Sequence, residues 1–254
     1  MHLRPNLAMA RNVLVFGATS AIAHAIDRRF AGEGASLVLV GRDRPKLEAN
    51  AADLSVRGAT KILTLAADLN DFAGHRELID RAVGELGRLD IVLIAHGTLP
   101  DQEGCENNVA ELRRAIDTNL ASVMSLSMAA ASRLVEQRQG SLVVIGSVAG
   151  DRGRRRNYVY GAAKAGVAVF CDGLRARLRP SGVHVLTVKP GFVDTPMTAG
   201  FAKGMLWVAP ERIATAVCRA IEQRKSVIYA PWFWRPIMFA IRALPSAILS
   251  RLNI

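Results

Sequence analysis

Short apolar runs alternate with longer amphipathic stretches along most of this 254-residue chain. Each run is long enough for a buried strand and too short for a free-standing helix. Most of the runs end at a glycine or a polar residue, after which apolar residues follow at helical spacing. The runs predicted to be strands are Val13–Phe16, SLVLVG up to Gly41, KILTLA before Asp68, DIVLI before Gly97, Leu142–Ile145 and VHVLTVK before Pro190.

The stretches between these runs predict helices. One begins near Ser20 and ends at residues 32–34, another covers Asp71–Leu86, and a long helical region covers roughly Asn107–Arg138. Alternation of strands and helices, without repeats or a low-complexity linker, is typical of one parallel sheet with right-handed crossovers. The sequence therefore predicts a single α/β domain of the doubly wound, Rossmann type, with a mostly parallel sheet and helices on both faces.

The turn after the first predicted strand has the features of a phosphate-binding site. Gly17 ends the strand and a helix begins near Ser20. The free N–H groups and the dipole of a helix N-terminus favour an anion there. Ala21 and Ala23 stand where the second and third glycines of a dinucleotide-binding turn would fall, but both are small enough to let a pyrophosphate approach.

The end of the second predicted strand indicates which dinucleotide is bound. An acidic side chain at this place would bind the ribose 2′-hydroxyl and repel a 2′-phosphate. The strand instead ends at Gly41 and is followed by Arg42, so we predict a preference for NADP(H), with NAD(H) as the alternative. A simpler interpretation is that Arg42 and Arg44 are only solvated. Asp68, after the third strand, could hydrogen-bond the adenine.

The strongest candidate for catalysis lies between Gly140 and Lys164. The strand Leu142–Ile145 leads to Ser147, which could hold a substrate oxygen, and a helix then carries Tyr160 and Lys164 on one face. The ammonium of Lys164 is expected to lower the pKa of Tyr160, as a general acid or base requires. The simpler interpretation is a surface pair, because Tyr-x-x-x-Lys occurs often by chance. Only Tyr160 of the three tyrosines has a lysine at this distance.

The pattern also indicates a role for two other polar residues, His96 and Asn119. His96, at the end of the fourth predicted strand, is expected to be structural, because a lone histidine at a strand end usually is. Asn119 lies in an apolar-periodic helical stretch, and the donors and acceptor of a buried amide must form hydrogen bonds. Asn119 is therefore either a polar link in the core or part of a proton relay.

Composition narrows the class of protein. Half of the residues are hydrophobic, which is ample for a sizeable core. The first apolar run is too short for a signal peptide, and the three cysteines are scattered without metal-ligand spacing. These features are typical of a cytoplasmic protein and indicate no metal site. The cysteines, expected to be buried thiols, are Cys105, Cys171 and Cys218.

The formal net charge of +11 and the isoelectric point near 10.4 indicate an anionic partner. A phosphorylated cofactor or substrate and an anionic lipid surface both fit this charge. Aromatic residues are few and are not interleaved with the basic residues, so nucleic acid is not expected to be a partner.

Taken together, these motifs resemble those of the short-chain dehydrogenase/reductase family over nearly the whole chain. The resemblance implies an NAD(P)-dependent oxidoreductase that acts on CH–OH or C=O groups and forms homodimers or homotetramers. Ile94–Gly97 stands where many members have Asn-Asn-Ala-Gly. The matching motifs are GATSAIA from Gly17 to Ala23, the pair Asp68 and Leu69, Asn119, Ser147, Tyr160 with Lys164, and Pro190 and Gly191 followed by Thr195.

The resemblance also implies a role for each of these residues. Tyr160 would be the proton donor or acceptor and Ser147 would hold the carbonyl oxygen. Lys164 would bind the nicotinamide ribose and Asn119 would hold a relay water, while Thr195 would meet the carboxamide. The implied cofactor-binding residues are Gly17, Thr19, Ser20, Ile22, Arg42, Asp68, Leu69, Gly97, Lys164, Pro190, Gly191, Val193 and Thr195.

The loop between Ser147 and Tyr160 is a candidate site for a substrate phosphate. It is rich in arginine, and the planar fork of an arginine suits phosphate oxygens. The alternative is an ordinary solvated loop. The arginines are Arg152, Arg154, Arg155 and Arg156.

The C-terminal stretch is apolar, carries arginines and is interrupted by prolines too often for a comfortable membrane-spanning helix. Trp232, Phe233 and Trp234 beside arginines predict a segment that lies on a membrane surface. The alternative is an apolar tail packed over the substrate pocket or against another subunit.

The arginine-rich loop and this tail resemble the subgroup of the family that reduces decaprenylphosphoryl 2-keto-erythro-pentose. The expected organisation is a tail at residues 1–10, a dinucleotide-binding catalytic domain at residues 11–230, and an apolar, basic segment at residues 231–254.

The expected function is a cytoplasmic reductase, peripheral on the inner face of the membrane, that transfers hydride from NAD(P)H to a keto group. The expected substrate is a phosphate-bearing or lipid-linked keto-sugar. The alternatives are a reductase or dehydrogenase of a simple hydrophobic ketone or alcohol, and a nucleotide-sensing scaffold without turnover.

Overall fold

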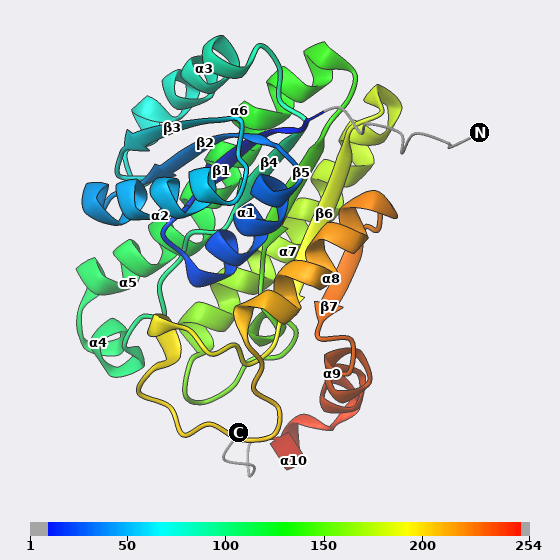
Figure 1. The fold of residues 1–254 in the computed structure, drawn as a ribbon. Coiled ribbons are helices and arrows are strands. Elements are labelled where there is room, and N and C mark those ends of the chain that lie inside the picture. The colour runs from blue at the N-terminus through cyan, green and yellow to red at the C-terminus, as the bar shows by residue number, and fades with distance from the viewer. Residues whose placement is uncertain (1–9, 250–254) are drawn as a thin grey trace.

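The computed structural model describes residues 10–249, which form one parallel sheet covered by helices on both faces (Figure 1). The strand order is β3-β2-β1-β4-β5-β6-β7, and each neighbouring pair is parallel. The predicted single doubly wound domain is confirmed. The strands are β1 Asn12–Phe16, β2 Ser36–Gly41, β3 Lys61–Ala66, β4 Ile91–Ile94, β5 Ser141–Ile145, β6 His184–Pro190 and β7 Val227–Ala230.

Ten α-helices are found among residues 10–249, joined by short 3₁₀ turns and one π-helical turn. The short turns are η1 Phe72–Gly74, the π-helical η2 Asp117–Ala121, η3 Val148–Gly150, η4 Arg179–Ser181 and η5 Pro196–Thr198. The helices are α1 Ala21–Gly32, α2 Arg44–Val56, α3 His75–Leu86, α4 Gln102–Asn107, α5 Val109–Ile116, α6 Ser122–Gln137, α7 Tyr158–Leu178, α8 Pro210–Glu222, α9 Trp234–Ala243 and α10 Ser246–Leu249.

The sheet separates two hydrophobic cores. Successive strand side chains point to opposite faces, so Val13 and Val15 of β1 pack with α1, α2 and α8, whereas Leu14 and Phe16 pack with α3, α6 and α7. Burial on both faces explains why each strand is a nearly continuous apolar run rather than an alternating one.

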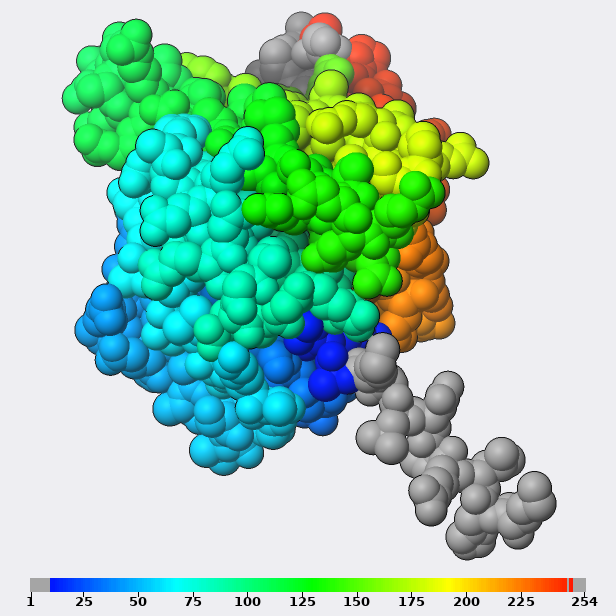
Figure 2. All heavy atoms as spheres, turned by 90° about the horizontal axis from the view of Figure 1, so that it is seen from above, coloured from blue at the N-terminus to red at the C-terminus, as the bar shows by residue number. Residues whose placement is uncertain are grey.

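The sequence did not predict two parts of this architecture. β7 pairs with β6 at the edge of the sheet, and its four residues, Val227–Ala230, do not stand out from the apolar stretch that follows them. The predicted helical region Asn107–Arg138 is interrupted at η2 between α5 and α6. α4 and α5 stand out from the body as a lobe, green in the space-filling view (Figure 2).

The C-terminal segment packs against the domain through one side of α9. Trp234 and Met238 are buried and form a small cluster with Val148, next to Ser147. Trp232 and Phe239 remain 74% and 77% exposed. No helix within residues 10–249 has the length and apolarity needed to cross a bilayer. Residues 1–9 and 250–254, which include most of the predicted tail, lie outside the described residues.

Candidate active site

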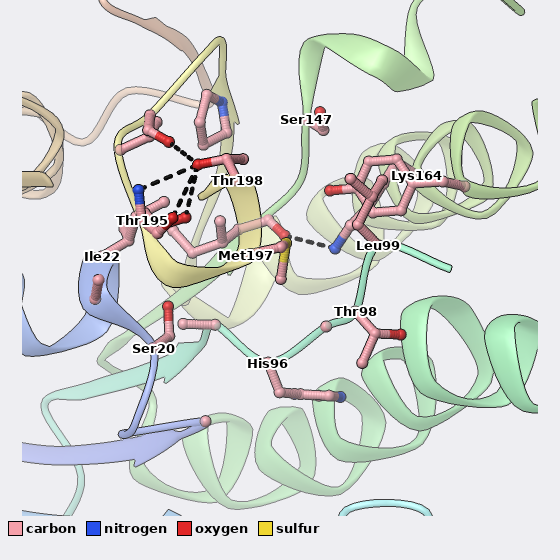
Figure 3. Close-up of a pocket in the computed structure, with 18 of the residues that line it drawn as sticks. Ser20, Ile22, His96, Thr98, Leu99, Ser147, Lys164, Thr195, Met197 and Thr198 are labelled. Carbon is pink, nitrogen blue, oxygen red and sulfur yellow. Dashed lines mark hydrogen bonds between the residues drawn. The ribbon is translucent and has the colours of Figure 1, made fainter. Parts of the chain in front are cut away.

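A cavity of about 400 Å³ opens at the carboxyl ends of the strands. In Figure 3, Ser20 and Ile22 line one side of it, His96 and Thr98 lie along the floor, and Ser147 and Lys164 stand opposite. All of the predicted cofactor residues contribute to its walls, and so do Ser147, Tyr160 and Arg154. Asn119, Arg152, Arg155 and Arg156 do not line it.

The turn from β1 to α1 has the geometry required for close approach of a phosphate. Gly17 has φ = 79°, which disfavours any residue with a Cβ. A Cβ there would also lie 2.5 Å from the backbone nitrogen of His96. Ser20 precedes α1 without capping it through its side chain, so the N–H groups of the first turn lack helical partners and face the cavity. This cradle fits a dinucleotide pyrophosphate.

The end of β2 presents a cation and no available carboxylate. Arg42 is exposed and lines the cavity beside the buried Gly41. The nearest acid along the chain, Asp43, accepts a hydrogen bond of 3.0 Å from the Lys46 N–H and caps α2. Its carboxylate is therefore committed to the helix rather than to a ribose.

Ser147, Tyr160 and Lys164 meet on one wall of the cavity. Ser147 follows β5 and accepts a hydrogen bond of 3.1 Å from the Ala149 N–H, which fixes the η3 turn. Tyr160 and Lys164 lie in the first two turns of α7, and the Lys164 ammonium is 5.8 Å from the centre of the Tyr160 ring. Lys164 also donates to the carbonyl oxygen of Ile145 at 3.2 Å (dashed in Figure 3).

The expectation that Lys164 lowers the pKa of Tyr160 is wrong for this structure. Burial raises the pKa of Tyr160 above its usual value, and a hydrogen bond with Ser147 only partly opposes this. The Lys164 ammonium lies over the ring, 5.8 Å from its centre, and donates to the Ile145 carbonyl rather than to the phenol oxygen, so desolvation determines the direction of the shift. Tyr160 is consequently a protonated phenol at neutral pH, the form that can donate a proton.

The charge of Lys164 predicts how cofactor capture depends on pH. Burial lowers the pKa of Lys164 to about 8, so the ammonium is present below that pH and is lost as pH rises through it. We expect kcat/KM for the reduced cofactor, which reports ionisations of the free enzyme, to fall above about pH 8. A Lys164→Arg variant should keep its charge and show no such fall. A wild-type profile that stays flat to pH 10 would contradict the assignment.

Asn119 is a polar link in the part of the chain that the structure describes. It is fully buried in η2, where its side-chain oxygen accepts from the Thr98 N–H at 3.0 Å and its nitrogen donates to the Ala115 carbonyl at 3.0 Å. The π-helical turn places this amide directly behind Gly97, where a Cβ would lie 2.9 Å from the Asn119 oxygen. A water-holding role for Asn119 stays a prediction.

His96 is held in a single neutral form. Its Nε2 lies 2.7 Å from the Ser122 hydroxyl, which itself donates to the Thr118 carbonyl. Ser122 therefore accepts from Nε2–H, and burial lowers the pKa of His96 to about 3. These contacts fit the predicted structural role: His96 supports the floor of the cavity and its backbone abuts Gly17.

An aromatic wall of the cavity was not predicted. The Phe192 ring stacks on Trp207 at 5.3 Å and meets the edge of Trp234 at 5.1 Å. Phe201 and Met197 complete this side. All of them except Trp234 come from the segment after β6, where no hydrophobic period marks them, and Trp234 belongs to α9 in the C-terminal stretch. The nearest signal in the sequence was the FVDTPM stretch itself.

Only one residue of the arginine cluster reaches the cavity. Arg154 lines it, and its Nε is buried without a hydrogen-bond partner among the described residues. Arg155 and Arg156 are exposed, and Arg152 donates to the carbonyl of Leu244 at 3.4 Å. The loop therefore divides into one arginine at the cavity and three elsewhere.

Comparisons with known proteins agree with this architecture. The family model "short chain dehydrogenase" matches residues 11–205. An uncharacterized oxidoreductase of Mycobacterium tuberculosis H37Rv is 39% identical over 96% of this chain and 97% of its own length. One of Streptomyces coelicolor is 35% identical over 95% and 96%.

Solved structures show the same relationship. Levodione reductase superimposes with a TM-score of 0.79 and 25% identity over 87% of this chain and 95% of its own. A short chain dehydrogenase/reductase family protein gives a TM-score of 0.76 and 32% identity over the same shares. The chain therefore belongs to the short-chain dehydrogenase/reductase family of NAD(P)-dependent oxidoreductases.

Proposed function

We propose that the protein reduces a keto group to an alcohol. The observation that supports this most directly is the convergence of Ser147, Tyr160 and Lys164 on the cavity that the predicted cofactor residues line. The reduced nicotinamide of the cofactor would supply a hydride to the carbonyl carbon. Tyr160 would donate its phenolic proton to the carbonyl oxygen while Ser147 holds that oxygen, and Lys164 would bind the nicotinamide ribose. Tyr160 is protonated at neutral pH, as donation of its proton to the carbonyl oxygen requires.

The test is oxidation of NADPH and NADH in the presence of a panel of keto compounds that includes a polyprenyl-phosphate keto-sugar and simple hydrophobic ketones. Turnover with any ketone supports the proposed chemistry. Tight cofactor binding without turnover across the panel would favour the nucleotide-sensing alternative.

The proposed substrate is a phosphate-bearing or lipid-linked keto-sugar. Arg154 at the cavity, with its unpartnered Nε, supports a phosphate, and the wall of Phe192, Phe201 and Trp207 supports an apolar portion. The same wall also favours the second candidate, a simple hydrophobic ketone. Turnover confined to the phosphate-bearing compounds of the panel separates the two.

The proposed cofactor preference is for NADP(H). Arg42 lines the cavity and Asp43 is engaged at the cap of α2, which supports binding of a 2′-phosphate. We expect Arg42→Ala to reduce the preference for NADPH over NADH by about 10- to 150-fold, since a charge-assisted bond contributes roughly 1.5–3 kcal/mol. Kd values measured by nicotinamide fluorescence check this. The matched control is Arg44→Ala, an exposed arginine that does not line the cavity, and an unchanged preference in Arg42→Ala would show that Arg42 is merely solvated.

We propose peripheral association with an anionic membrane through the outer side of α9. Phe239 is exposed on α9 and Trp232 just before it, Arg235 lies between them in the sequence, and the chain has no acidic residue after Glu222. We expect Trp232→Ser/Phe239→Ser to weaken co-sedimentation with phosphatidylglycerol vesicles at least tenfold. A matched control, Val56→Ser/Val109→Ser, removes exposed apolar groups from α2 and α5. Equal binding of wild type and both variants would contradict this.

A homodimer or homotetramer is proposed on exposed apolar side chains elsewhere. Val169 on α7 and Met128 on α6 are 73% and 48% exposed. Analytical ultracentrifugation of wild type and Val169→Ser tests whether these helices form the interface.

A further inference from the structure

A buried carboxylate occupies the loop between Ser147 and Tyr160. The Asp151 side chain is 2% exposed and its two oxygens are both engaged. One forms an ion pair of 2.5 Å with the Lys189 ammonium, which is itself 15% exposed, and the other accepts from the Tyr229 hydroxyl at 2.6 Å. Both partners come from strands outside the loop, so the contact ties the loop to the sheet.

The two partners of Asp151 are themselves arranged as a pair. Lys189 and Tyr229 are opposite each other in the β6–β7 register, and the Lys189 ammonium lies 5.4 Å from the centre of the Tyr229 ring. Burial and Asp151 together raise the pKa of Tyr229 to about 12, so Tyr229 remains a donor. The strands thus present two donors to one carboxylate.

Arg154 lies three residues after Asp151 and has no such partner. It forms no ion pair within residues 10–249, and its buried Nε has no acceptor there. Burial lowers the pKa of Arg154, and the only charge that opposes this is that of Asp151. Asp151 lies three residues away in the same loop, and its own oxygens are held by Lys189 and Tyr229.

Without Lys189, the Asp151 carboxylate would be a desolvated anion in the same loop as Arg154, whose buried Nε has no acceptor. Pairing of the two would satisfy both, because arginine binds carboxylates with two parallel hydrogen bonds. Arg154 would then no longer be free for a ligand. The ion pair between Asp151 and Lys189 therefore keeps the Asp151 carboxylate from pairing with Arg154.

We propose that Lys189 and Tyr229 sequester Asp151 and thereby leave Arg154 free to bind the anionic group of the substrate. This inference rests on the proposed function, in which the substrate carries a phosphate. Arg154 would be the residue that contacts the anion. Lys189 and Tyr229 would not contact the substrate. They would act through Asp151 and so determine specificity for anionic over neutral substrates.

The test compares an anionic and a neutral probe with the same tail on the protein saturated with NADP⁺, so that the cofactor's phosphate sites are filled. Calorimetry gives Kd for octyl phosphate and for octanol. We expect Arg154→Met and Lys189→Met each to weaken octyl phosphate about tenfold or more and to leave octanol within about twofold. Tyr229→Phe, a milder change, should give a smaller loss of the same kind.

Two variants separate this role from a general structural one. Asp151→Asn/Lys189→Met removes the competing carboxylate as well, and we expect it to restore the affinity for octyl phosphate to within about twofold of wild type. Arg155→Met, which alters an exposed arginine off the cavity, should change neither probe. Circular dichroism and thermal melts establish that each variant is folded.

Specific outcomes would overturn the proposal. They are an octyl phosphate affinity that Arg154→Met leaves unchanged, an equal loss for both probes in Lys189→Met, or a double variant without recovery. The readout is binding, so it is independent of turnover. If the protein reduced no ketone, the proposed function would be wrong. The expected Kd values for the variants would still assign the anion site to Arg154.

Discussion

Tyr160→Phe is expected to lower kcat for ketone reduction by about 10²–10⁴-fold, the range that a positioned general acid contributes. The substitution removes only the hydroxyl at the wall of the cavity. The ring and its contact with the Lys164 ammonium at 5.8 Å are retained, so the cofactor site should be undisturbed. Stopped-flow or steady-state oxidation of the reduced cofactor measures the loss.

Cofactor affinity is the control for this variant. Kd for the reduced cofactor, measured by its fluorescence, should stay within about twofold of the wild type, because none of the groups at Gly17 or Arg42 is altered. A second control, Tyr158→Phe, removes an exposed phenol that bonds Glu106 at 2.8 Å at the start of the same helix. Turnover by Tyr160→Phe at the rate of Tyr158→Phe would exclude Tyr160 as the proton donor.

Asp151→Asn is expected to reduce the free energy of unfolding by about 3–5 kcal/mol, the usual cost of removing one partner of a buried ion pair. The amide keeps the shape and an acceptor for Tyr229 but leaves the Lys189 ammonium, 15% exposed, without its counter-charge. For a chain of this length the melting temperature should fall by roughly 6–20 °C. Urea denaturation monitored by circular dichroism gives the free energy directly.

The double variant Asp151→Asn/Lys189→Met distinguishes an unpaired charge from lost packing. It removes both charges from the buried site, and replacing a whole pair by neutral groups costs far less than breaking it. We expect it to recover more than half of the stability that Asp151→Asn loses. A loss below about 1 kcal/mol in Asp151→Asn would mean that the pair behaves like an exposed one.

The two experiments report on neighbouring parts of the site, the loop after Ser147 and the start of α7. The η3 turn after Ser147 is tied to α7, because a Cβ at Gly150 would lie 2.6 Å from the carbonyl carbon of Lys164. It is tied to α9 by Val148 and to the sheet by Asp151. Any kinetic defect in Asp151→Asn would therefore arise from displacement of Ser147. The defect in Tyr160→Phe arises from loss of the phenolic hydroxyl alone.

Much of the fold was determined by the sequence alone. The apolar runs ending at Phe16, Gly41 and Ile145 had to be strands, because burial on both faces leaves no polar positions to alternate. Their alternation with helices predicts a parallel sheet, and the carboxyl ends of parallel strands meet at one edge. That rule placed Gly17, Arg42, Asp68, Gly97, Ser147 and Pro190 at the cavity, whereas the family resemblance implied the remaining cofactor positions, such as Thr195.

What spacing could not determine were quantities that depend on distant neighbours. The separation of Tyr160 and Lys164 predicts that they share a helix face, but the sign of the Tyr160 pKa shift depends on how completely the fold removes water from the phenol. Desolvation is produced by every element around the cavity, and no local pattern encodes it.

The substrate side shows the same division. Composition identifies an arginine-rich loop, and only the tertiary structure selects Arg154, because Lys189 and Tyr229 arrive from strands far along the chain to hold Asp151. The packing of Trp234 beside Gly191, which leaves no room for a side chain there, likewise joins α9 to the end of β6. Hydrophobic period specifies which face of an element is buried, whereas long-range packing decides which charges meet and which stay free.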